Sequence, residues 1–107
     1  MKEYNKLIRD KIPEYIASQG GKSETRTLED AEYRSELYKK LLEESQELVE
    51  KQGGDKQEVI NEIADVLEVL EAIMKLEGLS QQEVVDRQQQ KREERGSFDK
   101  KIFLIRS

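Results

Sequence analysis

The chain has 107 residues, enough for one domain (residues 1–107) with a modest core, and 40% of them are charged while 35% are hydrophobic. It contains neither cysteine nor histidine, which excludes disulfides, thiolate nucleophiles and imidazole ligands, so a bound metal would need oxygen ligands, as Mg²⁺, Mn²⁺ and Ca²⁺ do. The net charge of −5 argues against a nucleic-acid-binding surface, and no stretch has the length and apolarity of a signal peptide or membrane span, so we expect a soluble, cytoplasmic protein without a membrane partner.

The first part of the chain predicts an extended arm, a short helix and a short extended segment. Residues 1–8 are polar with few apolar positions, and Asp10 can cap a helix that has Pro13 in its first turn and ends before Gly20. Residues 22–27 then alternate in a way that predicts a short extended or β segment. This region carries three basic residues that are either ordinary surface charge or substrate contacts: Lys6, Arg9 and Lys11.

Two long helical patterns follow, and a tight connection at Gly53 and Gly54 separates them. The first runs from Glu29 to about Lys51 without glycine or proline. The second opens with a capping-box pattern at residues 55–58 and continues to residue 77. Because the connection is short, the two helices are expected to form an antiparallel hairpin.

Two pairs of carboxylates interrupt the apolar stripes of these helices: Glu44 and Glu47 on the first, Glu62 and Asp65 on the second. Each pair lies about two turns from the loop, so an antiparallel hairpin places all four at the same height. A carboxylate that faces a core without a partner is costly, and a shared divalent cation is one remedy. The alternative is ordinary solvated charge, which we accept for other acidic residues of the two helices: Glu43, Glu50, Glu68 and Glu71.

The second long helix is apolar on more than one side, so one neighbouring helix cannot cover it. A chain this short most simply supplies the missing contact with another copy. We therefore expect a homodimer or homotetramer whose interface includes four residues of this helix: Val66, Leu70, Ile73 and Met74.

The last part of the chain predicts a helix and a tail. Gly78 is the expected C-cap of the preceding helix, and residues 80–83 form a second capping-box pattern that opens a helix to about Arg95. Residues 98–105 predict an extended or β segment, in which Lys100 and Lys101 either solubilise an edge strand or contact phosphate. The expected fold class is all-α: an antiparallel helical hairpin plus shorter helices in an oligomeric bundle, with short extended or β segments near 22–27 and 98–105.

Three segments resemble one known family. The acidic signature of the all-α nucleoside triphosphate pyrophosphohydrolases, the MazG-like superfamily, is similar to Glu43-Glu44-Ser45-Gln46-Glu47 followed by Glu62-Ile63-Ala64-Asp65. Residues 5–14 resemble the amino-terminal motif of a house-cleaning, phosphoribosyl-ATP pyrophosphohydrolase-like branch. Residues 95–98 and the following Lys-Ile-Phe-Leu resemble the carboxyl-terminal motif of that branch.

The resemblance implies Mg²⁺-dependent hydrolysis, with Mn²⁺ as the alternative ion, of a standard or modified nucleoside triphosphate to the monophosphate and pyrophosphate. It places Glu44, Glu47, Glu62 and Asp65 at the metal-ligand positions. Glu43 matches an additional acidic position and is the candidate catalytic residue, with its part as ligand, base or support left open. The candidates for neutralising the phosphates are Lys6, Arg9, Lys11, Lys100 and Lys101.

Two other functions remain open on the sequence. A non-catalytic, homo-oligomeric helical adaptor explains the apolar helix and the high charge, although it leaves the matched carboxylates unexplained. A nucleotide-binding sensor would bind the triphosphate without cleaving it. Stabilisation by a divalent metal distinguishes the adaptor, and release of pyrophosphate distinguishes the sensor.

Overall fold

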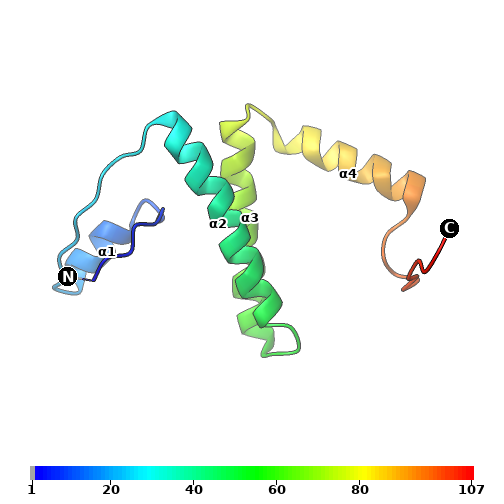
Figure 1. The fold of residues 1–107 in the computed structure, drawn as a ribbon, viewed down its shortest axis with the longest axis horizontal. Coiled ribbons are helices and arrows are strands. Elements are labelled where there is room, and N and C mark those ends of the chain that lie inside the picture. The colour runs from blue at the N-terminus through cyan, green and yellow to red at the C-terminus, as the bar shows by residue number, and fades with distance from the viewer. Residues whose placement is uncertain (1) are drawn as a thin grey trace. The chain divides into compact units, whose positions relative to one another are not determined.

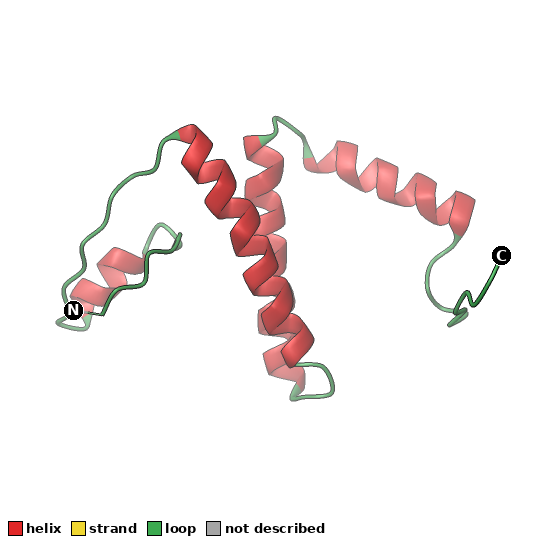
Figure 2. Cartoon of the chain, viewed as in Figure 1, coloured by secondary structure: helices red, strands yellow, loops and turns green. Residues whose placement is uncertain are grey.

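The computed structural model describes residues 2–107, which contain four α-helices (Figure 1). In chain order they are α1 (Ile12–Ser18), α2 (Asp30–Glu50), α3 (Lys56–Leu76) and α4 (Gln81–Arg95). None of residues 2–107 lies in a β-strand (Figure 2). The predicted all-α class is confirmed. Within this described part, no helix has the length and apolarity needed to cross a membrane.

The chain divides into two units, the first ending at Ile73 and the second running from Met74 to Ser107. The first unit is built on the expected hairpin, in which α2 and α3 run antiparallel to each other (Figure 1). Its most buried apolar side chains are Leu37 on α2 and Val69 on α3. Such a small core agrees with the thin apolar content of the chain.

Helix α1 begins later than the sequence predicts, and Asp10 is not its N-cap. The N-cap is Lys11, which makes no side-chain capping hydrogen bond. The Ile12 amide donates to the Arg9 carbonyl at 3.1 Å, so a turn already occupies the residues from which an Asp10 cap would act. Pro13 lies in the first turn, as expected, because its missing N–H costs nothing there.

Of the two alternatives predicted for residues 22–27 and 98–105, extended or β, the β alternative is not found, because neither segment is a strand. Residues 22–27 lead into α2 without a partner strand, and Arg26 instead donates to both carboxylate oxygens of Glu32, at 2.9 and 2.6 Å. At residues 98–101 the chain turns, since the Lys101 amide donates to the Phe98 carbonyl at 3.2 Å and Lys101 has φ 58°. A strand needs a neighbour that completes its hydrogen bonds, and residues 2–107 offer none.

The second unit carries α4, whose start is as predicted. The Ser80 side chain accepts from the Glu83 amide, and the Glu83 side chain accepts from the Ser80 amide, which completes the capping box. The helix is followed by Gly96 at φ 84°, a conformation that favours glycine. Beyond it the apolar side chains of the tail are largely exposed, among them Phe98 at 97%.

Candidate metal centre

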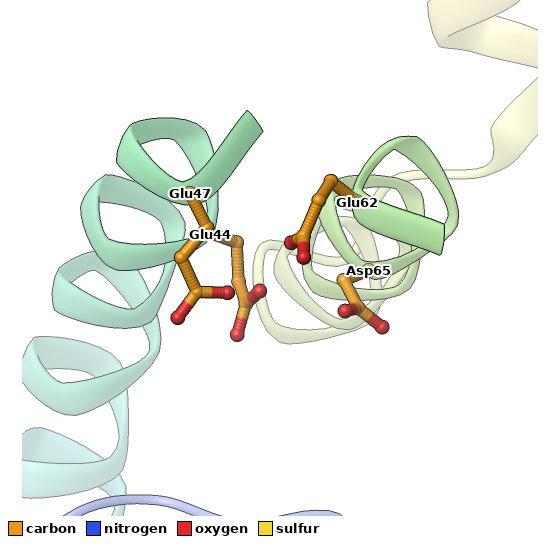
Figure 3. A group of neighbouring side chains, drawn as sticks. All are labelled: Glu44, Glu47, Glu62 and Asp65. Carbon is orange, nitrogen blue, oxygen red and sulfur yellow. The ribbon is translucent and has the colours of Figure 1, made fainter. Parts of the chain in front are cut away.

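Four carboxylates from the hairpin meet at one place, which we call the carboxylate cluster: Glu44, Glu47, Glu62 and Asp65. One oxygen of each residue lies within 4.8 Å of the corresponding oxygens of the others. Glu44 and Glu47 come from α2, while Glu62 and Asp65 come from α3 (Figure 3). The predicted match in height across the hairpin is confirmed.

The local sequence explains how α2 brings two charges, buried Glu44 and exposed Glu47, to the same side of the hairpin. Leu37, Leu41 and Leu48 are buried or half-buried on one side of α2, and Glu44 falls in the same stripe because it is seven residues from Leu37. Glu47 follows three residues later, close enough to share that side of the helix. Because Glu44 lies in the apolar stripe that forms the hairpin contact, it is brought into that contact together with the leucines.

Burial leaves two carboxylate oxygens without partners. Glu44 is only 8% exposed, and its Oε2 atom makes no hydrogen bond within the described residues. The Oε2 atom of Glu62 is likewise buried and unpaired in this part of the chain. A buried polar atom that loses water without gaining a partner is costly, and such atoms are rare in folded proteins. Both atoms belong to the carboxylate cluster.

The same surroundings shift the acid–base equilibrium of Glu44. Burial raises its pKa above the ordinary value, and the hydrogen bond and negative charge of Glu47 raise it further. The charge of Asp65 acts in the same direction, whereas Lys40 opposes the shift. The cluster therefore holds its negative charge at a cost in free energy, which a divalent cation would relieve.

Two cations contact the cluster, Arg9 from the segment before α1 and Lys40 from α2. The guanidinium of Arg9 donates to Asp65 at 2.8 Å, and the ammonium of Lys40 lies 3.5 Å from Glu44. Arg9 was one of the predicted phosphate contacts. Lys40 was missed, although its spacing of four residues before Glu44 is a recognisable helical ion-pair signal.

The other predicted site residues are not part of the carboxylate cluster. Glu43 is half-buried beside Lys40, with 3.9 Å between Oε2 and Nζ, and is not one of the four clustered carboxylates. Lys6 lies over the ring of Tyr4, 5.3 Å from its centroid, and Lys11 is the N-cap of α1. The last two phosphate candidates are exposed residues of the second unit: Lys100 and Lys101.

The chemistry of the cluster fits a hard divalent cation. All four donors are carboxylates, the ligand type that Mg²⁺ and Mn²⁺ accept, and two of their oxygens are buried without a hydrogen bond from any described residue. Cations that prefer thiolate or imidazole ligands have no such donors in a chain without cysteine or histidine.

Comparison with known proteins identifies a family. A family model described as phosphoribosyl-ATP pyrophosphohydrolase matches residues 1–92. This stretch includes α1, α2, α3 and the whole carboxylate cluster, while the basic tail residues Lys100 and Lys101 lie outside it. No curated protein and no solved structure matches the chain. The family predicted from the sequence motifs is confirmed, while the carboxyl-terminal motif that begins at residue 95 lies outside the matched stretch.

Proposed function

Since the chain belongs to the phosphoribosyl-ATP pyrophosphohydrolase family, we propose that it hydrolyses a nucleoside triphosphate group to the monophosphate and pyrophosphate with the help of Mg²⁺. Mn²⁺ is the alternative ion. The proposed ligands are the four residues of the carboxylate cluster: Glu44, Glu47, Glu62 and Asp65.

The buried, unpaired oxygens of Glu44 and Glu62 are the observation that carries this proposal. A carboxylate on a solvated helix surface accepts hydrogen bonds from water, and a carboxylate in a structural core accepts them from a protein donor. These two buried atoms have no hydrogen-bond donor within residues 2–107, and they lie close to two further carboxylates. An incoming cation explains why selection would keep four like charges together.

The residues around the carboxylate cluster have separate proposed roles. A divalent cation bound among carboxylates supplies charge neutralisation for phosphate oxygens and an acidified water. Arg9 is the proposed residue that neutralises a phosphate at the cluster, and its hydrogen bond to Asp65 supports this role. Glu43 shares Lys40 with Glu44, which favours a part in positioning its neighbours over contact with the substrate.

The substrate is defined only as far as the triphosphate group. Phosphoribosyl-ATP, free ATP and modified nucleotides all present that group, and the family description names the first of them. Release of pyrophosphate from each compound, with and without Mg²⁺, tests the activity directly. Absence of pyrophosphate from every compound at millimolar Mg²⁺ would exclude it and leave a sensor or an adaptor.

We also propose that the protein works as a homo-oligomer. Five large apolar side chains of the hairpin are 44–73% exposed: Leu42, Val49, Ile60, Ile63 and Leu67. Their spacing along α2 and α3 places them on one side of each helix, away from the carboxylates. The four residues named from the sequence, Val66, Leu70, Ile73 and Met74, are half-buried, so the more exposed set is the better candidate for an interface. A second copy of the hairpin would cover it.

A further inference from the structure

Lys40 holds an unusual place among the basic residues of the first unit. Its side chain is only 21% exposed, and its ammonium group lies 3.5 Å from Oε1 of Glu44, whose side chain is 11% exposed. The Arg9–Asp65 pair, which joins the segment before α1 to α3, is more open, with exposures of 56% and 40%. Solvent screens exposed ion pairs strongly and buried ones much less, so the Lys40–Glu44 pair is the less screened of the two, although its 3.5 Å separation is longer than the 2.8 Å of Arg9–Asp65.

The two carboxylate oxygens of Glu44 have different surroundings. Oε1 faces Lys40, whereas Oε2 is buried and makes no hydrogen bond within the described residues. The ammonium group therefore neutralises part of the cluster charge without satisfying the atom that is left for a ligand. It also contacts Glu43 at 3.9 Å, so one cation serves two carboxylates of α2.

We propose that Lys40 is the internal counter-ion of the carboxylate cluster. It stabilises the charged cluster while no metal is bound, and it lowers the affinity for the metal because its positive charge repels a second cation nearby. This inference rests on the proposed metal site and adds a positioning residue to it. These two effects of Lys40 stabilise the folded protein when no metal is bound and limit how tightly the metal binds.

The repulsion sets the direction of the expected effect. A unit charge within about 4–6 Å of a divalent ion weakens its binding measurably even at the high effective dielectric of a partly exposed site. Neutral glutamine at this position removes the repulsion and the stabilising pair together. Metal-free stability and metal affinity should therefore change in opposite directions, which the loss of an ordinary structural contact would not produce.

The experiment compares Lys40→Gln with Lys39→Gln, because Lys39 is the adjacent lysine of α2 and is exposed. We expect Lys40→Gln to lower the melting temperature in EDTA and to bind Mn²⁺ at least about threefold more tightly by calorimetric titration. Lys40→Arg keeps the charge and should retain the wild-type Mn²⁺ affinity. Equal Mn²⁺ affinity in the two glutamine variants, or weaker binding by Lys40→Gln, would overturn the proposal.

A double-mutant cycle keeps the result interpretable if Lys40→Gln is too unstable to titrate. Combining it with Glu44→Gln removes both partners, so the stability lost in the single variant should largely return if the pair causes the loss. No such recovery would contradict the counter-ion role. If the wild-type protein binds no Mn²⁺ at all, the proposed metal site fails, while the cycle in EDTA still decides whether Lys40 stabilises Glu44.

Discussion

The guanidinium of Arg9 lies 2.8 Å from the carboxylate of Asp65, although 56 positions separate the two residues in the chain. The contact ties the segment before α1 to the acidic end of the site on α3. Because both side chains are substantially exposed, the ion pair itself contributes little to folding. The role of Arg9 is better explained by the positive charge that it brings to the carboxylate cluster.

The first prediction separates these two contributions of Arg9. Arg9→Gln should lower kcat/KM for pyrophosphate release by about tenfold to a hundredfold, because a phosphate loses a charged donor. The free energy of unfolding should change by less than about 1 kcal/mol, as expected for an exposed pair. Activity assays and urea denaturation measure the two effects. Lys22→Gln, an exposed neutralisation in the same unit, is the control. A large loss of stability with unchanged activity would assign Arg9 a structural role instead.

The second prediction concerns Glu62, whose unpaired oxygen marks it as a proposed ligand. Glu62→Gln should reduce activity at least about a hundredfold and remove most of the stabilisation by Mg²⁺. At a hundredfold excess over Kd that stabilisation is about 2.7 kcal/mol in the wild type. Metal-free stability should stay level or rise, since one repelling charge is gone.

Glu68 provides the matched comparison, because it is an exposed glutamate on the same helix. Glu68→Gln should leave both activity and the response to Mg²⁺ at the wild-type level. If the two variants lose activity equally, or if neither the wild type nor Glu68→Gln is stabilised by Mg²⁺, the metal-site assignment is wrong and the adaptor becomes the better explanation.

The third prediction follows from the raised pKa of Glu44. An acid whose folded pKa lies above its unfolded value binds protons more tightly in the folded state, so its contribution to stability is greatest at low pH. That contribution is lost as the pH rises through the unfolded and then the folded pKa. In EDTA, the wild type should therefore lose stability across this window relative to Glu44→Gln.

Denaturation of both proteins at a series of pH values tests this point, and the difference between them isolates Glu44. The comparison is needed because the pKa of Glu32 is lowered, chiefly by its hydrogen bond from Arg26, and this exposed group acts in the opposite direction in both proteins. Parallel stability curves for the wild type and Glu44→Gln would contradict the shift. Added Mg²⁺ should reverse the trend, because the ion competes with protons for the carboxylate.

The sequence predicted the hairpin and the cluster because both depend on local signals. The spacing of Glu44 and Glu62 from a short glycine loop fixes their height, and the capping box at Ser80 depends only on nearby residues. The errors arose where local patterns were ambiguous or needed a partner. Asp10 is a good capping residue, but it lies inside the turn closed by the Ile12 amide and the Arg9 carbonyl, and the helix begins after that turn.

The tail shows the other limit of sequence reasoning. Its β-branched and aromatic residues favour a strand, yet a strand forms only beside another strand, and propensity carries no information about neighbours. Lys40 shows the reverse case, in which the helical spacing to Glu44 was available but a lysine in a highly charged helix gave no reason to single it out. Burial, which the structure supplies, distinguishes it from Lys39.

The last prediction tests the exposed apolar side of the hairpin. Leu67 is 55% exposed on α3, and burying such a side chain against a second copy is worth roughly 1.5–3 kcal/mol when burial is complete. Leu67→Glu places a charge in the proposed interface, so the solution mass should fall toward that of one chain of 12.5 kDa. Light scattering measures the mass, and circular dichroism checks that the helices remain. Val85→Glu, which changes a 49% exposed valine of α4 in the second unit, should leave the mass unchanged. A wild-type protein that is already a stable monomer, or a Leu67→Glu variant with the wild-type mass, would show that this surface is not the interface.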